Sequence, residues 1–293
     1  MTIQLGKIGI WTSTWQWPKD PGKLQDAAGA LDEAGYGTLW IGAVIGDLAL
    51  PLATLDASER MVVATGIVDV WTNPAPAVAA NFHTLSGKHP GRFVLGLGSS
   101  HAVLVESVTD HTYIRPLSRL RGFLDDLDAA DPPVPADRRV LAALGPKALQ
   151  LAAERSAGAH PYLVTPEHTA TAREVMGAGP VLAPEQKVVF ETDATKARDI
   201  ARQSLAIYLS LPNYLNNLRR LGFQDDDFAD GGSDRLVDEL VAWGDLSTVK
   251  QRLDAHFDAG ADHVCVQVLT DGGTTSLPLE GWQELATLLP DYS

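Results

Sequence analysis

The chain has 293 residues, of which 45% are hydrophobic, and it contains 26 Gly and 18 Pro. This length and composition fit one large α/β domain spanning residues 1–293 better than two small domains. The formal net charge of −14 argues against a nucleic-acid partner, because binding to phosphates needs clustered Lys and Arg.

Short apolar runs alternate with longer segments of helical period, which is typical of strand–helix units repeated around a parallel sheet. Strands are expected at residues 7–12, 38–41, 61–70, 92–98, 140–144, 161–164, 187–191 and 263–269. Helices are expected at 21–34, 51–58, 77–86 and 116–130, then after Pro146, Glu167 and Ala194, and finally between Ser247 and Gly260. Eight such units in a chain of this length predict a (β/α)8 TIM barrel.

Residues 206–244 do not follow this alternation and are predicted to be a helical insertion before the last unit. The segment contains Tyr208, Tyr214 and the acidic run 225–227. We favour a helical cover over one barrel end, with a direct role in substrate binding as the alternative. Function itself is expected in the loops that follow the carboxyl ends of the strands.

Cys265 is the only cysteine, so no disulfide can form within one chain, and a cytoplasmic location is expected. The first residues lack the pattern of a signal peptide, and no apolar run approaches the roughly 18 residues of a membrane span. The histidines show no metal-ligand spacing, so no metal site is expected. These observations predict a soluble protein without a membrane partner.

Residues 64–98 read ATGIVDVWTNPAPAVAANFHTLSGKHPGRFVLGLG, and this segment resembles the luciferase-like, F420-dependent oxidoreductases. The later segments LPNYLNNLRRLGF and AGADHVCVQVL are similar to a subgroup assigned to coenzyme F420. The resemblance implies a luciferase-like barrel that transfers hydride between F420 and a small organic substrate. An FMN-dependent monooxygenase and a non-catalytic protein that binds flavin or F420 remain alternatives, and the oligomeric state, including a homodimer, stays open.

The fourth expected strand ends in small residues, Gly98 and Ser99, which let the backbone approach a planar ring or a phosphate closely. A tight turn without a ligand explains the same residues. His101 follows them and is predicted to project into the barrel mouth, where an imidazole can exchange a proton near neutral pH. In related F420 enzymes a carboxylate can occupy this place, so Glu106 is the second candidate for proton transfer.

By the same resemblance, Val68, Asp69 and Val70 lie where the family commonly has a bulge and a non-prolyl cis peptide behind the flavin-like ring. Asp69 interrupts an apolar strand and therefore needs a partner, which is either the cofactor region or an ordinary ion pair. Trp11 and Trp40 stand near the ends of the first two expected strands and are our candidates for aromatic contacts in the pocket, with core packing or an oligomer contact as the alternative.

The run Leu144-Gly145-Pro146-Lys147 opens the helix after the fifth expected strand, and a helix N-terminus at the barrel mouth favours anions. The resemblance implies that Gly145 and neighbouring amides hold the phosphate or ribityl chain of the coenzyme. Thr165 and His168 in the next loop would then add side-chain contacts. Residues 42–44 depart from the family, which often has an acidic residue and a histidine there, and this puts the substrate chemistry of those relatives in doubt for this chain.

Overall fold

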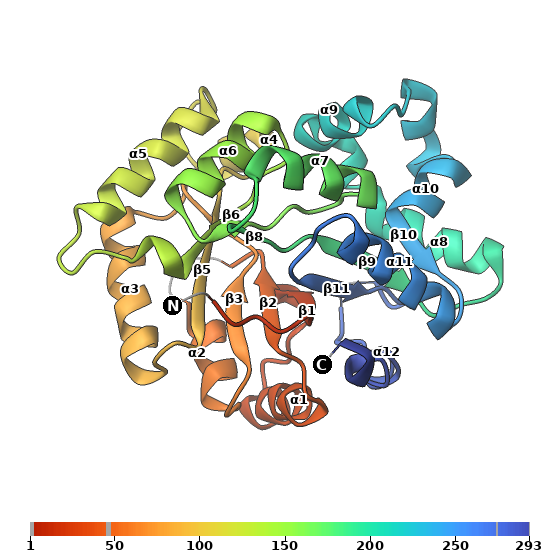
Figure 1. Ribbon diagram of the computed structural model, residues 1–293, viewed down its shortest axis with the longest axis horizontal. Helices are drawn as coiled ribbons and strands as arrows, with labels where there is room; N and C mark the ends of the chain where they lie inside the picture. Colours follow the sequence, from red (N-terminus) through yellow and green to blue (C-terminus); the bar gives the residue numbers. More distant parts are fainter. Residues whose placement is uncertain (1–2, 45–47, 274, 293) are drawn as a thin grey trace.

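The computed structural model describes residues 3–44, 48–273 and 275–292, in which parallel strands are surrounded by helices (Figure 1). The strands are β1 (Ile8–Ser13), β2 (Thr38–Gly42), β3 (Val62–Thr65), β4 (Val68–Asp69), β5 (Phe93–Gly98), β6 (Arg139–Leu141), β7 (Gly158–Ala159), β8 (Val181–Leu182), β9 (Glu185–Val189), β10 (Val241–Trp243) and β11 (Val264–Val268). Their order in the sheet is β10-β9-β11-β1-β2-β3-β5-β6-β7-β8, with β4 paired to β5.

Strand β8 lies at one end of this order and continues into β9, next to the other end, with only Ala183 and Pro184 between them. β8 pairs with β7, whereas β9 pairs with β11, and the Pro184 carbonyl oxygen accepts a hydrogen bond from the Cys265 amide (3.0 Å). The strands therefore form a curled parallel sheet, and the predicted α/β fold is confirmed at this level.

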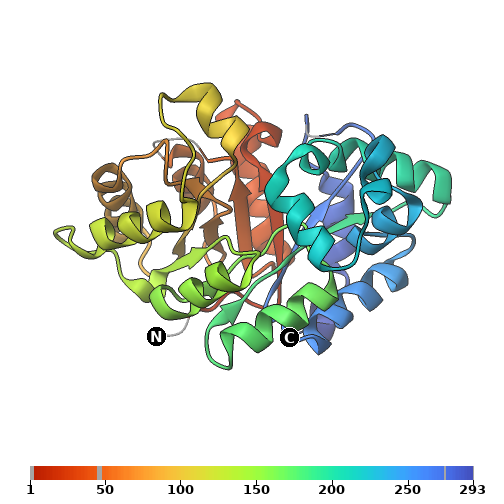
Figure 2. The same cartoon turned by 90° about the horizontal axis from the view of Figure 1, so that it is seen from above.

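The helices lie outside the strands. Seen from above, helices α3, α5 and α6 lie on one side of β1 and β2, and helices α8 to α11 lie on the other side (Figure 2). They are α1 (Pro21–Ala34), α2 (Ala49–Asp56), α3 (Ala75–Lys88), α4 (Ala102–Val108), α5 (Pro116–Asp128), α6 (Pro146–Arg155), α7 (Pro166–Met176), α8 (Ala194–Leu205), α9 (Pro212–Arg220), α10 (Asp234–Leu240), α11 (Leu246–Asp258) and α12 (Leu279–Ala286). Short 3-10 helices are η1 (Thr14–Gln16), η2 (Ala136–Arg138), η3 (Tyr208–Ser210), η4 (Asp225–Gly231) and η5 (Leu289–Tyr292).

Local sequence explains where several helices begin and end. The Asp20 side chain caps α1 by accepting a hydrogen bond from the Lys23 amide (2.9 Å), and Pro21 fits the first turn because it has no amide hydrogen to satisfy. Gly35 ends the helix at a φ of +92°, a left-handed conformation that strongly favours glycine.

Several strand predictions differ from the structure. The expected strand at 161–164 is irregular, because Leu163 adopts a φ of +58°, and the strand of this unit is the earlier β7. The expected strand at 61–70 is divided into β3 and β4 by a cis peptide bond between Gly66 and Ile67. Two strands, β8 and β10, and the helices α4 and α12 were not predicted.

The segment 206–244 contains η3, α9, η4 and α10 and ends in β10, which pairs with β9. It thus contributes a strand to the sheet as well as helices. Its helix α9 supplies side chains to the cavity described below.

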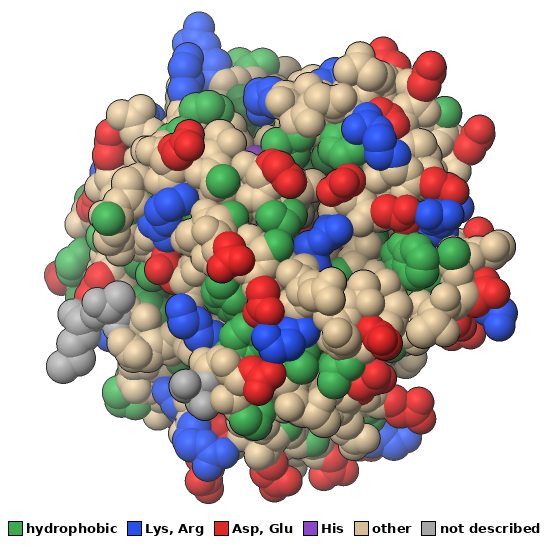
Figure 3. Space-filling model, turned by 45° about the vertical axis from the view of Figure 1, so that its right-hand side comes forward, with side chains coloured by type: hydrophobic (Ala, Val, Ile, Leu, Met, Phe, Trp, Pro, Cys, Tyr) green, Lys and Arg blue, Asp and Glu red, His purple; other side chains and the backbone are tan. Residues whose placement is uncertain are grey.

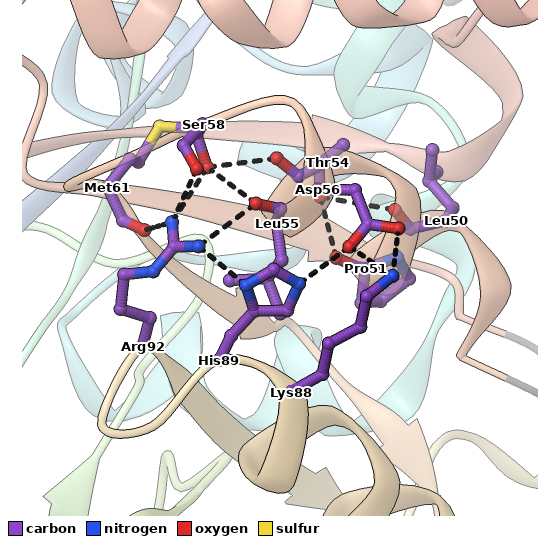
Figure 4. A network of polar contacts seen from close by, with 10 residues as sticks. All are labelled: Leu50, Pro51, Thr54, Leu55, Asp56, Ser58, Met61, Lys88, His89 and Arg92. Carbon is purple, nitrogen blue, oxygen red and sulfur yellow. Dashed lines mark hydrogen bonds and ion pairs between the residues drawn. The ribbon is translucent and has the colours of Figure 1, made fainter.

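A polar network ties the ends of α2 and α3 together at the opposite ends of the strands from that cavity (Figure 4). The Arg92 guanidinium donates to the Ser58 carbonyl oxygen (2.9 Å) and to His89 Nδ1 (2.7 Å), while His89 Nε2 contacts Asp56 Oδ1 (2.6 Å). Lys88 also binds Asp56, and this ion pair lowers the pKa of the Asp56 carboxyl. The network therefore supports the fold rather than the site.

On the face drawn in Figure 3, Lys and Arg side chains are scattered among Asp and Glu and form no continuous basic patch. Within the described ranges, no helix combines the length and apolar character needed to cross a membrane.

Candidate functional site

A cavity of about 980 Å³ opens at the carboxyl ends of the parallel strands. It is bordered by the loops after β1, β2, β3, β5, β6 and β7 and by α9. This volume lies at the upper end of the roughly 300–1,000 Å³ of small-molecule sites, so the cavity has room for a cofactor together with a substrate. A second cavity of about 520 Å³ lies between α1 and α12, and no predicted site residue borders it.

The floor of the large cavity is formed around Gly66 and Ile67. A Cβ atom on Gly66 would lie 2.8 Å from Trp11 Nε1 and 3.3 Å from His160 Nε2, so only glycine fits here without a shift. Both ring nitrogens are buried and have no hydrogen-bond partner among the described residues. His160 Nδ1 donates to the Ala183 carbonyl oxygen (2.8 Å), which leaves Nε2 as an acceptor. His160 borders the cavity and therefore brings a free acceptor to it, whereas Trp11 does not border the cavity and packs beside Gly66.

His101 is the N-cap residue of α4, directly after β5, and its side chain borders the cavity. The ring lies 5.0 Å from the Tyr214 ring, and Nδ1 is buried without a partner in the described part of the chain. Burial lowers the pKa of His101 to about 4. The imidazole is therefore neutral at neutral pH and is suited to accept a proton. This corrects the expectation that it titrates near neutral pH, which neglected the loss of hydration.

Gly145 is the N-cap residue of α6 and places that helix N-terminus at the cavity. A Cβ on Gly145 would lie 3.6 Å from Arg220 Nη1, so the guanidinium at the end of α9 faces the start of α6. Arg220 also borders the cavity and forms no ion pair within the described ranges. A helix N-terminus together with an unpaired guanidinium is an arrangement that suits a phosphate group.

Asp69 borders the cavity, and its carboxylate accepts hydrogen bonds from the Trp71 amide (3.1 Å) and the Thr72 hydroxyl (3.0 Å). These local bonds explain a carboxylate at this strand end, although burial still raises the pKa of Asp69. Ser99 and Ser100 border the cavity nearby, and the Ser100 carbonyl oxygen accepts from the Tyr113 hydroxyl (3.1 Å).

The model of the family described as "Luciferase-like monooxygenase" matches residues 4–263. The chain belongs to the luciferase-like monooxygenase family. The resemblance inferred from residues 64–98 is thereby confirmed, and with it the assignment of the protein to a class of oxidoreductases.

The relatives include users of both cofactors. A curated Mycobacterium tuberculosis (strain ATCC 25618 / H37Rv) protein with the name "Putative coenzyme F420-dependent oxidoreductase Rv3520c" is 25% identical over 337 aligned residues, covering 91% of this chain and 95% of the relative. Among solved structures, an F420-dependent secondary alcohol dehydrogenase in complex with an F420-acetone adduct has a TM-score of 0.74 at 16% identity, with 100% of both chains covered. The coenzyme F420-dependent tetrahydromethanopterin reductase from Methanopyrus kandleri has a TM-score of 0.77 at 16% identity, covering 98% of this chain and 99% of that one.

An FMN complex belongs to the same set. The oxygenating constituent of 3,6-diketocamphane monooxygenase from Pseudomonas putida has a TM-score of 0.67 at 15% identity, covering 98% of this chain and 97% of that one. At such identities the structural likeness establishes the luciferase-like fold alone.

The structure brings five of the predicted site residues of this luciferase-like protein to the cavity: Asp69, Ser99, His101, Leu144 and Gly145. Others lie close behind its walls. Trp11 lies under Gly66, Gly98 packs against Ile67, and Val68 and Val70 are buried beside the end of β5.

The remaining predicted residues do not border the cavity. Trp40 is buried within the curled sheet, where it stacks on His160 (4.3 Å between ring centroids) and donates to His263 Nε2 (3.0 Å). Glu106, the second candidate for proton transfer, is exposed on α4 and accepts a hydrogen bond from the Tyr113 amide (2.9 Å). In this geometry it is not placed to exchange a proton with a ligand in the cavity. Pro146 and Lys147 are exposed on α6.

Thr165 and His168 are buried behind the loop that carries Gly145. His168 Nε2 donates to the Leu144 carbonyl oxygen (2.8 Å), and Thr165 caps α7. Their position indicates that they support the Gly145 loop instead of contacting a ligand directly.

Sequence analysis missed a buried polar cluster beside the cavity. Lys187 donates to Glu185 Oε1 (2.9 Å) and to Gln267 Oε1 (3.1 Å), and its ammonium lies 3.9 Å from the centre of the Tyr162 ring. The Tyr162 hydroxyl donates to Gln267 Oε1 (2.8 Å), and Tyr162 borders the cavity. Burial lowers the pKa of Lys187, although the neighbouring Glu185 carboxylate opposes this shift.

This cluster fixes the wall of the cavity. Glu185 Oε2 accepts from the Leu163 amide (3.1 Å), which holds the left-handed turn at Leu163 and thereby Tyr162. The signal in the sequence was the alternation of Glu185 and Lys187 on a strand, which directs both side chains to the same face.

Proposed function

We propose that the protein is an oxidoreductase that transfers hydride between coenzyme F420 and a small organic substrate. One observation carries the proposal: a single cavity joins a half-buried neutral imidazole, His101, to an end that suits a phosphate group, at Gly145 and Arg220. The F420-dependent relatives support the choice of cofactor.

The residues present fit such a coenzyme. The unpartnered His160 Nε2, which borders the cavity beside Gly66, suits a polar edge of a flat heterocycle, and Arg220 with the start of α6 suits its phosphate. When bound, F420 would accept or donate the hydride.

The contribution of the protein is binding, orientation and proton transfer. In the oxidative direction the substrate carbinol loses a hydride from carbon and its hydroxyl proton to the neutral His101 imidazole, and a carbonyl group forms. In the reverse direction the protonated imidazole returns the proton to the oxygen. Closely packed walls, including Tyr162 and Tyr214, would limit the access of water to this step.

We expect the purified protein to bind F420 at least about tenfold more tightly than FMN, a difference of about 1.4 kcal/mol. Titration of the cofactor-free protein with each compound, followed by absorption and calorimetry, measures the two dissociation constants. Equal affinities, or FMN alone co-purifying with the protein, would instead favour an FMN-dependent monooxygenase.

At the phosphate end, Gly145→Val and Arg220→Met should each raise the dissociation constant of F420 by at least about tenfold. The valine places a side chain where amides approach the phosphate, and the methionine removes the guanidinium. Gly145 has an ordinary φ of −91°, so the valine should change stability by no more than about 1 kcal/mol.

Arg219→Met is the matched control, because Arg219 pairs with Asp225 (2.7 Å) and does not border the cavity. Its dissociation constant for F420 should match the parent. Unchanged binding by both cavity variants would place the phosphate elsewhere.

A further inference from the structure

Exposed apolar side chains gather at one side of the cavity. Among the described residues, five of the eight large hydrophobic side chains that stand exposed lie on η1 or between residues 103 and 114. Three of these five border the cavity, namely Trp15 (62% exposed), Leu104 (44%) and Val108 (70%), and we call them the apolar rim. Because exposed apolar surface is unfavourable in water, its concentration at a cavity mouth points to an apolar ligand part.

Two residues of the apolar rim lie on the helix that begins at His101. His101, Leu104 and Val108 are spaced at i, i+3 and i+7, so they lie along the same side of α4, and all three border the cavity. With a rise of about 1.5 Å per residue, the distance along the helix from His101 to Val108 is about 10 Å. A substrate whose oxygen atom lies at His101 could therefore extend its chain along an apolar surface of about this length.

The charges around the cavity leave no cation for an anionic substrate once the coenzyme phosphate occupies Arg220. Among the described residues that border the cavity, Arg220 is the only Lys or Arg. Its guanidinium lies beside Gly145, which is on the loop after β6. Asp69 is the only acidic residue there, and its carboxylate is held by Trp71 and Thr72. A phosphorylated substrate would have to compete with the coenzyme for Arg220.

Small apolar side chains complete the path. Ala43 and Val44 follow β2 and border the cavity. The family often has an acidic residue and a histidine at this place. This sector therefore adds apolar surface instead of hydrogen-bonding groups.

We propose that the substrate is an uncharged alcohol or carbonyl compound whose apolar chain, about 10 Å long, extends from His101 along Leu104 and Val108 toward Trp15. The inference rests on the proposed function for its redox step, which removes a hydride from the carbinol carbon to F420 and the hydroxyl proton to His101. The binding preference itself rests on the apolar rim alone.

The test is calorimetry of the cofactor-free protein with secondary alkanols from butanol to decanol. The association constant should rise about fourfold per added CH₂ group and level off once the chain spans the rim. Leu104→Asp and Val108→Asp should abolish this dependence on chain length. Val103→Asp is the matched control, because Val103 is exposed on the same helix but does not border the cavity. Circular dichroism confirms that each variant is folded.

The outcomes separate the two proposals. Flat affinities along the series, or tighter binding of glucose 6-phosphate than of any alkanol, overturn the inference even if F420 binds and turns over. A steep series with no hydride transfer to F420 overturns the proposed function and leaves the inference standing. Sedimentation and binding to phosphatidylcholine vesicles test the other uses of the rim. If the parent forms oligomers or binds the vesicles, and both Leu104→Asp and Val103→Asp remove that property, the rim is an interface between copies or with a membrane. The inference is then wrong.

Discussion

Replacing Lys187 with methionine is expected to lower the free energy of unfolding by about 3–5 kcal/mol. The Lys187 side chain is 0% exposed and its partner Glu185 is 1% exposed, so both charges lie in the interior of the curled sheet. Methionine keeps most of the side-chain volume but leaves the Glu185 carboxylate without a compensating charge. Denaturation by guanidinium chloride, followed by circular dichroism at neutral pH, measures the loss.

Acid should reduce this loss. As the pH falls, the unpaired carboxylate of the variant takes up a proton, and a neutral carboxyl is less costly to bury than a carboxylate. The difference between variant and parent should therefore be smaller in acid than at neutral pH. Adding Glu185→Gln to the variant should recover most of the stability at neutral pH, since it removes the uncompensated charge directly.

Lys250→Met provides the control. Lys250 pairs with Asp254 at 2.9 Å, but the two side chains are 33% and 42% exposed, so its loss should leave the free energy of unfolding close to that of the parent. A cost below about 1 kcal/mol for Lys187→Met would mean that water reaches the buried pair. In that case the cluster could not hold Tyr162 in the way we infer.

The fold class followed from the sequence because buried parallel strands leave a strong pattern. Apolar runs such as 92–98 and 263–269 are each followed or preceded by helices with identifiable caps, and they fall on β5 and β11. The shortest strands left no such pattern. β7 consists of Gly158 and Ala159, which have low β-propensity, so the apolar run at 161–164 drew the prediction away from it.

The site was predictable where it depends on strand ends and unpredictable where it depends on tertiary packing. His101 and Gly145 follow strands directly, so counting the units places them at one mouth. Arg220 is far from Gly145 in sequence, and only the packing of α9 brings them together. α4 escaped prediction because Val103, Leu104 and Val108 are exposed and only Val105 is buried, which weakens the usual division into a buried and an exposed face.

Replacing His101 with alanine should reduce turnover by about two orders of magnitude while changing the dissociation constant of F420 by no more than about threefold. The expected loss is the usual contribution of general acid–base catalysis. Cofactor affinity should persist because the proposed phosphate contacts lie at Gly145 and Arg220. The assay is hydride transfer between F420 and a panel of alcohols, aldehydes and activated alkenes.

The pH profile provides the sharper readout. Since burial lowers the pKa of His101 to about 4, kcat/KM for alcohol oxidation in the parent should fall as the pH drops through that value. This acidic limb should be absent from the residual activity of His101→Ala. Oxidation by the parent should vary little with His101 ionisation around neutral pH, where the imidazole is already neutral.

The fraction of folded protein must be measured at each pH, because other buried histidines weaken the fold in acid. Burial lowers the pKa of both His160 and His263 to about 4, below their ordinary value of 6.5. The unfolded chain therefore binds these protons first, and stability declines as the pH falls from 6.5 toward about 4. Circular dichroism at each point separates this decline from the titration of His101.

His83→Ala is the control for removing a histidine, because His83 lies on α3, contacts the Pro132 carbonyl oxygen (2.9 Å) and does not border the cavity. It should retain the parental turnover and pH profile. If His101→Ala also turns over like the parent at every pH, proton transfer must use solvent or another group. Glu106 would be a poor replacement, since its carboxylate is exposed and bound to the Tyr113 amide. That result would reject the proton-transfer role of His101 while leaving the luciferase-like fold and the cofactor proposal to be judged by the F420 titration.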